Sequence, residues 1–555
     1  MLTIVAFACV SLVIFLLKYV FGSSGPNPFE KDCREPLKEK VYDKKEKNKI
    51  LKQGFVASKV PDNLDAVIIG SGVGGLGLAV LLAKVGKKVL VLEQHSRAGG
   101  CCHTFTEKGF EFDVGIHYIG DLMDHKPFRC MLDQMTNGQL QWEKLENPFD
   151  HVVLGPPENR RSYPIYSGSA RYSEELKKRF PGEEKAIDEY LKLVKKTGRG
   201  IWVMAVLKLC PLPLAKFLIH TGLVKHLSYF YKMAPRSLTD VVNELTENKD
   251  LRAVFTYIFG TYGNIPKDAS FAMHSLLTTH YLSGAWYPKA GSSEIGIFNT
   301  YEKLLPKELQ AMPEIQKQLS LVKHGAGGLS IFIGLNGTRE ELGLRANNYW
   351  IFADNNFDEL VEKYMNDGRE EASKKIPLLF VASPSAKDPS WEERSPGKST
   401  LTVVSFANHS WFEEWKDGKV TNRGPDYKEL KQAFIDSALN VVMDIFPKIT
   451  RDKIEYIDAG TPITNTHYIA APKGEIYGVD HGIARFSPEL NATIRPQTPL
   501  KNLYLTGQDV FLCGFAGALA GALTCGSVIL NRNLHLDAIA LAKKTKYMNN
   551  KLKDE

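Results

Sequence analysis

The sequence predicts an α/β protein in which a Rossmann-like domain is split between two distant parts of the chain, with an α+β domain inserted between them. A glycine-rich turn at residues 70–75 joins two short apolar runs that are typical of buried parallel strands. Far along the chain, residues 502–530 again join an apolar run to a glycine and a helix of small residues. We expect both segments to contribute strands to one sheet.

The glycine-rich turn has the spacing of a dinucleotide-binding motif. Val67–Ile69 predicts a buried strand, residues 76–84 predict a helix that Gly86 ends, and residues 88–92 predict a second strand. The motif glycines between them are Gly70, Gly72 and Gly75. The first permits a tight turn, the second lets the backbone approach a pyrophosphate, and the third lets the helix pack against the strand. Free N–H groups at the start of the helix favour the phosphates.

Glu93 closes the second strand and completes the motif. Its carboxylate can accept hydrogen bonds from ribose hydroxyls and disfavours a 2′-phosphate. The order of strand, turn, helix, strand and acid predicts a dinucleotide site far more strongly than the glycines alone. The motif does not distinguish FAD from NAD.

The residues that follow resemble a second glycine-pair motif of FAD enzymes in the amine oxidase and phytoene desaturase superfamily. Gly99 and Gly100 come shortly after Arg97, and a glycine pair again admits close approach of the backbone to a cofactor. Cys101 stands where the superfamily often has an arginine. The resemblance implies that Arg97 and the two glycines bind FAD.

The C-terminal segment resembles another FAD motif of the same superfamily. Residues 502–509 predict a strand that leads into Gly507 and Asp509, and a small-residue helix follows that contains Gly514 and Gly517. In the superfamily the aspartate holds the ribityl chain, and the helix N-terminus faces the pyrimidine edge of the flavin, where its dipole stabilises the anionic reduced form. The resemblance implies that these four residues bind FAD.

Longer segments extend the resemblance along nearly the whole chain. They read LEQHSRAGGCCHTF, FEFDVGIHYIG, TYGNIP, YPKAGSSEI, FNTYEKLLP, PSAKDPSWEER and NLYLTGQD. They are similar to the carotenoid and retinoid oxidoreductases, which include phytoene desaturases and carotenoid isomerases, and above all to the members that saturate retinol. This resemblance implies an FAD-dependent CH–CH oxidoreductase that converts all-trans-retinol to all-trans-13,14-dihydroretinol. It also implies NAD(P)H as a candidate electron donor and residence on the endoplasmic-reticulum membrane.

One junction departs from the family pattern. Ile295 runs directly into Gly296, where the resemblance leads us to expect several dozen further residues, including a strand of the cofactor domain. Loss of a central parallel strand exposes backbone groups and apolar surface. We therefore expect a splice or gene-model variant, or a chain with impaired FAD binding. Two alternatives to the reductase follow: a retinoid or carotenoid isomerase that uses reduced flavin, and an inactive membrane-associated variant.

Composition and charge exclude several classes of protein. The chain has 555 residues, 44% hydrophobic and 24% charged, as in ordinary globular proteins with a large core. Its net charge of +7 comes from residues 1–52 and 543–555, whereas the body between them is neutral. This distribution is unlike that of a nucleic-acid-binding protein and fits a body held near an anionic surface. The eight cysteines lack zinc-ligand spacing, so no metal site is predicted.

The two ends of the chain predict targeting to a membrane compartment. Residues 2–17 are almost wholly apolar, which is consistent with a signal peptide or a single anchor. The final KLKDE resembles a dilysine retrieval signal, although a solvated basic tail explains it equally well.

The expected regions are an N-terminal signal peptide or anchor (1–21), a charged linker (22–61), the first part of the FAD domain (62–125), a substrate- and membrane-facing insertion (126–285), an FAD-domain remnant (286–300), the substrate domain (301–495), the second part of the FAD domain (496–535) and a basic tail (536–555).

Residues 201–233 are apolar with interspersed lysines, and Pro211 and Pro213 prevent a single long helix. This pattern is typical of an interfacial element that admits a lipid substrate such as a retinoid from a membrane surface. A helical cap over an internal core explains it equally well.

The expected chemistry is hydride transfer from reduced flavin to one polyene carbon and proton delivery to the next. No sequence signal identifies the proton donor. The candidates are His117, Tyr118 and Tyr287, with His467 and Tyr468 as further titratable or aromatic groups. For each of them a packing role is the simpler interpretation.

Overall fold

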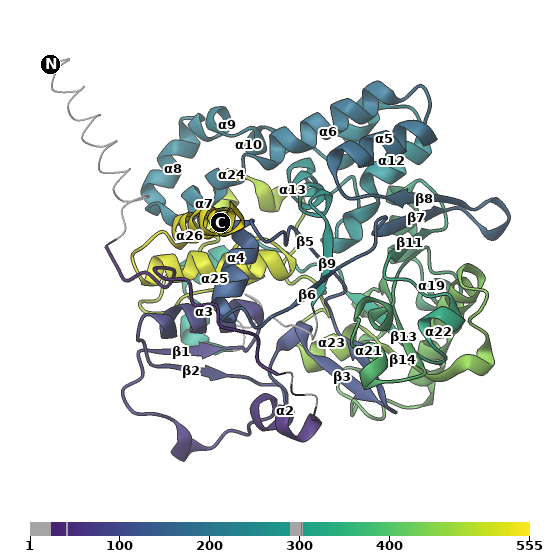
Figure 1. Cartoon of the computed structure of the whole chain (residues 1–555), viewed down its shortest axis with the longest axis horizontal. Coiled ribbons are helices and arrows are strands. Elements are labelled where there is room, and N and C mark those ends of the chain that lie inside the picture. The colour runs from purple at the N-terminus through teal and green to yellow at the C-terminus, as the bar shows by residue number, and fades with distance from the viewer. Residues whose placement is uncertain (1–23, 40, 42, 289–300, 302–303, 555) are drawn as a thin grey trace.

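The computed structural model describes residues 24–39, 41, 43–288, 301 and 304–554. The expected signal peptide or anchor at 1–21 and the Ile295–Gly296 junction therefore lie outside the described residues. Figure 1 shows three groups of elements: a cofactor domain that joins the two ends of the chain, a layer of helices, and a large sheet flanked by helices.

The cofactor domain contains the predicted strand–turn–helix–strand unit. Strands β1 (Ala66–Ile69) and β2 (Val89–Leu92) pair in parallel, and helix α3 (Val73–Lys84) connects them. Gly86 follows the helix with a positive φ of 82°, as a helix-ending glycine does. Helix α25 (Gly514–Ile529) packs against α3, so the purple and yellow ends of the chain lie side by side in Figure 1. The prediction of a split α/β fold is confirmed.

Two expectations about this sheet are wrong. Residues 502–506 do not form a strand beside β1, because Tyr504 makes only an isolated bridge to Gln497. Strand β1 is also not buried on both faces: the side chains of Val67 and Ile69 are 52% and 53% exposed. In a full parallel sheet, helices normally cover both faces of each strand. Here, within the described residues, β1 and β2 form a sheet by themselves.

The two halves of the domain meet instead through a close backbone contact. Thr506 donates from its hydroxyl to the carbonyl of Gly74 at 3.2 Å, and a β carbon on Gly74 would lie 2.6 Å from the Cα of Gly507. Leu519 and Ala522 of α25 pack against Gly77 of α3. Small residues on both helices therefore bring the second glycine segment onto the first.

The large sheet has seven strands in the order β14-β10-β13-β12-β11-β7-β8. Its pairs are antiparallel except for β11 with β7. Its strands are β7 (Asp150–Leu154), β8 (Arg161–Ile165), β10 (Gly328–Asn336), β11 (Asn348–Phe352), β12 (Leu378–Ala382), β13 (Lys398–Phe406) and β14 (Ile454–Gly460). Helix α22 (Pro425–Ile445) packs over one face of this sheet with buried apolar residues.

The helical layer is drawn from the predicted insertion. Its helices are α5 (Ser169–Arg179), α6 (Glu184–Gly198), α7 (Trp202–Leu209), α8 (Leu212–His220), α9 (Leu223–Leu227), α10 (Tyr229–Met233), α11 (Leu238–Leu245), α12 (Lys249–Thr256) and α13 (Phe271–Leu282). Pro211 caps α8 directly after α7 ends, so the predicted interruption of this apolar stretch is confirmed.

Two small sheets lie between the cofactor domain and the rest of the molecule. Hairpin β3 (Thr104–Glu107) with β4 (Phe110–Asp113) continues directly from the second glycine pair. Strands β5 (Ile119–Gly120), β9 (Ala285–Pro288) and β6 (Trp142–Lys144) form an antiparallel sheet with β9 in the centre. Together they carry the chain from the cofactor motif to the candidate catalytic residues.

The predicted linker and tail are only partly solvated. Phe29 is buried in the core of the cofactor domain, and Cys33 donates from its backbone N–H and its thiol to the side-chain oxygen of Gln134. Helix α26 (Leu534–Asp554) buries Leu534 and Leu541 in the same core. Apolar residues scattered among the charges explain this, because they bury one face of each segment.

In the part of the chain that the structure describes, no single helix is long and apolar enough to cross a membrane. Helices α25 and α26 together have sufficient length and apolar character, with a bend of 113° between them. Much of α25 is buried in the cofactor domain.

Candidate functional site

The first glycine turn has the geometry that the motif predicts. Gly70 adopts a φ of 100°, and its N–H donates to the carbonyl of Leu92 at 2.7 Å, which ties the turn to the end of β2. Gly72 is the N-cap residue of α3. A β carbon on Gly75 would lie 2.0 Å from the carbonyl oxygen of Gly70. Only glycine therefore fits at position 75, where the helix packs onto the turn.

A serine that the sequence analysis missed connects the turn to Glu93. The backbone N–H of Ser71 donates to the Glu93 carboxylate at 3.0 Å, and its hydroxyl donates at 2.6 Å. The N–H of Gly99 donates to the same hydroxyl at 3.0 Å, and the N–H of His95 donates to the other carboxylate oxygen at 2.8 Å. Ser71 thus joins both glycine motifs. The sequence signal that could have identified Ser71 is its position between Gly70 and Gly72 in the G-x-G motif.

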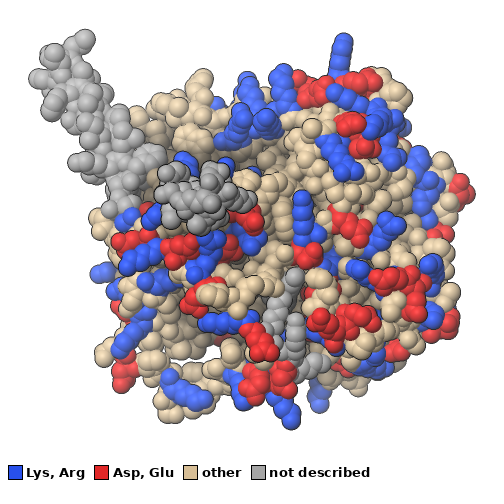
Figure 2. Space-filling view, in the orientation of Figure 1, with Lys and Arg blue, Asp and Glu red and all other residues tan. Residues whose placement is uncertain are grey.

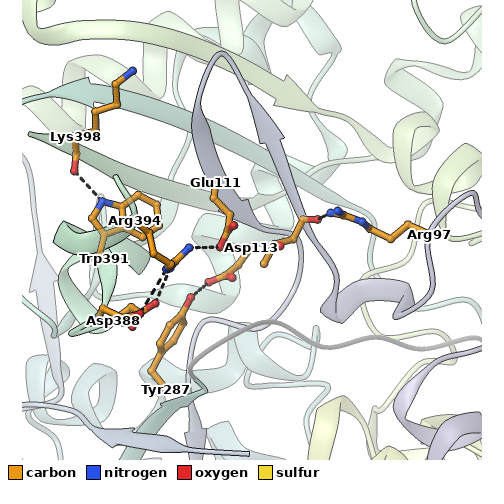
Figure 3. Close-up of polar contacts among 10 residues, drawn as sticks. Arg97, Glu111, Asp113, Tyr287, Asp388, Trp391, Arg394 and Lys398 are labelled. Carbon is orange, nitrogen blue, oxygen red and sulfur yellow. Dashed lines mark hydrogen bonds and ion pairs between the residues drawn. The ribbon is translucent and has the colours of Figure 1, made fainter. Parts of the chain in front are cut away.

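The second glycine pair lies directly beside the first turn. Gly99 and Gly100 have φ values of 119° and 49°, which favour glycine. Arg97 donates to the carbonyl of Thr104 and lies within 3.4 Å of Asn48 Oδ1, while its Nε is buried without a hydrogen-bond partner among the described residues. Figure 3 shows this guanidinium reaching toward β3, the partner strand of the one that carries Asp113. Its orphaned Nε is a donor suited to an anionic group.

The C-terminal motif residues lie on the other side of the Gly74 contact. Gly507 and Gly514 have φ values of 100° and 71°. A β carbon on Gly517 would lie 1.8 Å from the carbonyl of Leu512. The carboxylate of Asp509 is buried and accepts from the N–H of Val479 at 3.1 Å. The structure therefore places all predicted cofactor residues around one region, with backbone cradles that a side chain would fill, and these residues fit a dinucleotide.

Tyr287 lies beside a buried carboxyl group. Its hydroxyl on β9 donates to Asp113 at the end of β4. Figure 3 shows this pair next to a second layer of charge, in which Arg394 binds Glu111 at 3.1 Å and Asp388 at 2.6 Å. Burial raises the pKa of Asp113 to about 7, and the Tyr287 hydrogen bond opposes that rise. Asp113 can therefore hold a proton at neutral pH.

Tyr118 lies beside another buried carboxyl group, Asp150 at the start of β7. The hydroxyls of Tyr118 and Tyr257 both donate to Asp150 Oδ2, at 3.1 and 2.9 Å, and Asn348 donates to Oδ1 at 2.8 Å. Burial raises the pKa of Asp150 to about 6, although all three donors lower it. Both predicted tyrosines thus hydrogen-bond to a carboxyl group, an arrangement that sequence spacing does not show.

Lys387 lies between these two groups and was missed by the sequence analysis. Its ammonium group donates to the carbonyl of His117 at 2.8 Å and to the side chain of Asn348. It is 2% exposed, and burial lowers its pKa to about 7 while Asp113 and Asp150 oppose that shift. The motif PSAKDPSWEER contains Lys387, but nothing in the motif indicates that its side chain points inward.

His117 differs from the two tyrosines. Its Nδ1 is buried without a hydrogen-bond partner within the described part of the chain, and burial lowers its pKa to about 3. The imidazole is therefore uncharged at neutral pH and cannot supply a proton as a cation. Two further candidates, His467 and Tyr468, lie on α23 (Pro462–Tyr468), where Tyr468 is in ring contact with His95.

A small cavity of about 20 Å³ lies between the helical layer and the large sheet. Aromatic and aliphatic residues line it, including Phe149, Tyr257 and Tyr281. It lies beside the Asp150 carboxyl group, because Tyr257 donates to Asp150. A cavity of this size holds about one water molecule and is far smaller than a ligand pocket.

Comparisons with known proteins agree with this arrangement. Residues 68–135 match the family model of an NAD(P)-binding Rossmann-like domain. The chain is 65% identical to the all-trans-retinol 13,14-reductase of Danio rerio, with 98% of each chain covered, and 44% identical to the human all-trans-retinol 13,14-reductase, with 93% and 94% covered. Among solved structures, it superposes on cyclohexylamine oxidase from Brevibacterium oxydans with a TM-score of 0.50 and 14% identity, covering 88% of this chain and 100% of that one.

The split glycine motifs and the two-domain fold define the class of protein: a dinucleotide-binding α/β protein with the fold of the amine oxidases. The sequence identities of 65% and 44% over nearly the full chain then establish the family. The chain belongs to the all-trans-retinol 13,14-reductase family. The predicted resemblance is thereby confirmed.

The alignment with the Danio rerio relative spans 598 positions, whereas this chain has 555 residues. At least several dozen aligned positions therefore have no residue in this chain. The number is of the size expected at Ile295–Gly296, but the position of the gap stays a prediction. Val67 and Ile69 lie on one face of β1, and this face is exposed among the described residues.

Proposed function

We propose that this chain reduces the 13–14 double bond of all-trans-retinol, giving all-trans-13,14-dihydroretinol, with FAD as its bound cofactor. The observation that supports this most is the 65% identity, over 98% of the chain, to a protein of that name. The two glycine motifs and the buried proton-holding groups supply what such a reaction needs.

The cofactor residues have distinct tasks in this proposal. The α3 N-terminus behind Gly70 and Gly72 would hold the pyrophosphate, and Glu93 keeps acceptor capacity for ribose beside its Ser71 bonds. Arg97 and the Gly99–Gly100 pair would bind the same cofactor, and Asp509 and the α25 N-terminus with Gly514 and Gly517 would hold its flavin part. When bound, FAD supplies the hydride equivalent.

The residues of the chain must then orient the polyene, exclude water and deliver one proton. One carbon of the double bond receives the hydride and its neighbour receives a proton, so the π bond is replaced by two C–H bonds. Tyr287 and Tyr118 can each hand on a proton from a carboxyl group that burial keeps partly protonated. NAD(P)H is our proposed source of electrons for the flavin.

Incubation with all-trans-retinol and a reductant, followed by mass spectrometry, tests this function. A product heavier by two hydrogens supports the reductase, whereas a product of unchanged mass supports the isomerase alternative. The flavin absorbance of the purified protein, at roughly 350 to 500 nm, tests the inactive-variant alternative independently. A tightly bound cofactor should give on the order of one flavin per chain. The names of the relatives at 44–65% identity favour the reductase.

We further propose that the protein works at an endoplasmic-reticulum membrane surface. Helices α7 to α9 expose large apolar side chains, including Trp202 and Phe217 on α7 and α8 and Leu227 on α9. Lys216 and Lys225 are exposed among them, and Figure 2 shows Lys and Arg gathered along the upper edge of this face, over the helical layer. Exposed apolar groups flanked by lysines favour binding to an anionic lipid surface.

A further inference from the structure

One segment outside the glycine motifs holds Asp509 from two sides. The N–H of Val479 donates to the Asp509 carboxylate at 3.1 Å, and the guanidinium of Arg485 donates to the Asp509 backbone carbonyl at 2.7 Å. Arg485 lies on the short helix η9 (Ile483–Phe486), and it is 2% exposed. The motifs and the roles described above do not include this arginine.

The carbonyl groups that Arg485 faces belong to the loop that leads into α25. Asp509 lies in the helical turn η10 (Gln508–Val510), and the nitrogen that binds its carbonyl also lies 3.5 Å from the carbonyl oxygen of Phe511. Carbonyls at the end of a helical segment lack partners within it, and arginine side chains can bind them. Arg485 therefore fixes the path of the chain from Asp509 to Cys513, the N-cap residue of α25.

Arg485 is itself held in place by α24 (Pro488–Thr493). Its Nη1 donates to the side-chain oxygen of Asn491 at 3.3 Å. The backbone carbonyl of Asn491 accepts from the buried ammonium of Lys208 at 3.0 Å, and the carbonyl of Ile494 accepts from the same ammonium at 2.6 Å. Lys208 belongs to α7. A continuous set of hydrogen bonds thus runs from the helical layer through α24 to the cofactor loop.

A second buried arginine shows what the same side chain does elsewhere. Arg423 is 8% exposed, and it donates to the carbonyl of Ile463 at 3.3 Å and to the hydroxyl of Tyr427 at 3.4 Å. The Nε atoms of Arg423 and Arg485 are both buried without a hydrogen-bond partner among the described residues. The two arginines have similar burial and similar acceptors. They differ in what they hold, because the partners of Arg423 lie in the substrate domain.

We propose that Arg485 is a positioning residue of the cofactor site, which fixes the loop from Asp509 to Cys513 so that this loop and the α25 N-terminus can bind the flavin part of FAD. This inference rests on the proposed function, in which FAD is the bound cofactor. Arg485 acts through the loop and needs no contact of its own with the cofactor. Without the guanidinium, the Asp509 carbonyl loses its donor in a buried environment, which favours a shift of the loop.

Amide hydrogen exchange of the flavin-free chain tests the placement of the loop. The N–H groups of Val510, Phe511 and Gly514 donate within the loop at 3.2, 3.1 and 3.0 Å and so report its opening. We expect these amides to exchange about tenfold faster in Arg485→Met. The matched control is Arg423→Met, in which they should exchange as in the wild type. Wild-type exchange in Arg485→Met would overturn the proposal, whether or not the chain binds flavin.

Titration of the flavin-free chain with FAD tests the consequence for the cofactor. We expect Arg485→Met to weaken FAD binding about tenfold or more, and Arg423→Met to bind FAD as the wild type does even where its unfolding midpoint falls. Arg485→Lys keeps one donor for the Asp509 carbonyl but loses the planar fork. It should recover part of the affinity, and the absorption bands of its bound flavin should lie closer to those of the wild type than the bands of Arg485→Met do. Equal affinity in all four proteins would overturn the proposal.

The outcomes separate the role of Arg485 from the proposed function. If Arg485→Met does not fold, wild-type exchange and affinity in Arg485→Lys would overturn the proposal. A chain that makes no dihydroretinol but shows the expected differences in exchange and FAD affinity loses the proposed function and keeps the positioning role. A chain that makes dihydroretinol and shows no such differences keeps the function and loses the positioning role.

Discussion

The Cα of Gly507 lies 2.6 Å from the position that a β carbon on Gly74 would occupy. This contact joins the N-terminal glycine turn to the C-terminal cofactor motif, more than four hundred residues later in the chain. A β carbon on Gly521 would likewise lie 2.2 Å from the carbonyl of Gly507. The two halves of the cofactor site are therefore held together by backbone packing more than by strand pairing.

A methyl group at position 74 should separate these halves. We expect Gly74→Ala to lower the flavin content of the purified protein at least several-fold and to reduce the free energy of unfolding by about 1–3 kcal/mol, because overpacking forces the backbone to shift. Flavin absorbance and denaturant unfolding measure both effects. Gly54→Ala is the matched control, since a β carbon there meets nothing within 4 Å. Full flavin content in Gly74→Ala would contradict the importance of this contact.

Ser71 should matter for cofactor affinity although it is not one of the motif glycines. Ser71→Ala removes hydroxyl bonds to Glu93 and Gly99, so the acid and the second glycine pair lose a common anchor. We expect flavin affinity to fall by about tenfold, equivalent to the loss of about 1–2 kcal/mol of hydrogen bonding. Equilibrium dialysis against FAD measures it.

A second serine provides the control for that experiment. Ser410→Ala removes a hydroxyl bond on an exposed turn of the substrate domain and should leave flavin affinity unchanged. Equal affinity of Ser71→Ala and the wild type would show that the turn is ordered without this hydroxyl.

The pH dependence of stability should report the buried carboxyl group of Asp113. Its pKa is raised to about 7 in the folded chain, so the folded state binds more protons than the unfolded state between about pH 4 and pH 7. The free energy of unfolding therefore falls as pH rises through that window, by about 4 kcal/mol for a fully buried group. Asp113→Asn should remove most of this fall. An equal change in the free energy of unfolding between pH 5 and pH 7 in both proteins would contradict this prediction.

Membrane binding should depend on the exposed apolar side chains of the helical layer. Trp202 and Leu227 are 54% and 58% exposed, and replacing both with serine removes apolar surface that would enter a lipid interface. We expect partitioning onto vesicles containing phosphatidylserine to fall about tenfold or more. Co-sedimentation measures it on the full chain.

The control for membrane binding lies on the opposite domain. Ile50 on helix α2 (Lys44–Leu51) is also strongly exposed, and Ile50→Ser removes apolar surface away from α7–α9. We expect this variant to bind vesicles as the wild type does. A weaker binding of Ile50→Ser than of the double variant would place the membrane contact on the cofactor domain.

The strand–turn–helix–strand unit around Gly70 follows from the sequence by itself, since apolar runs and glycine spacing are local properties. The same holds for α25 and for the interruption at Pro211. Only the tertiary structure decided that residues 502–506 do not join β1, because strand pairing depends on partners far away in the chain. Only the tertiary structure, too, brought Lys387 between Asp113 and Asp150: residues far apart in sequence share one dry environment, and burial there sets their proton affinities.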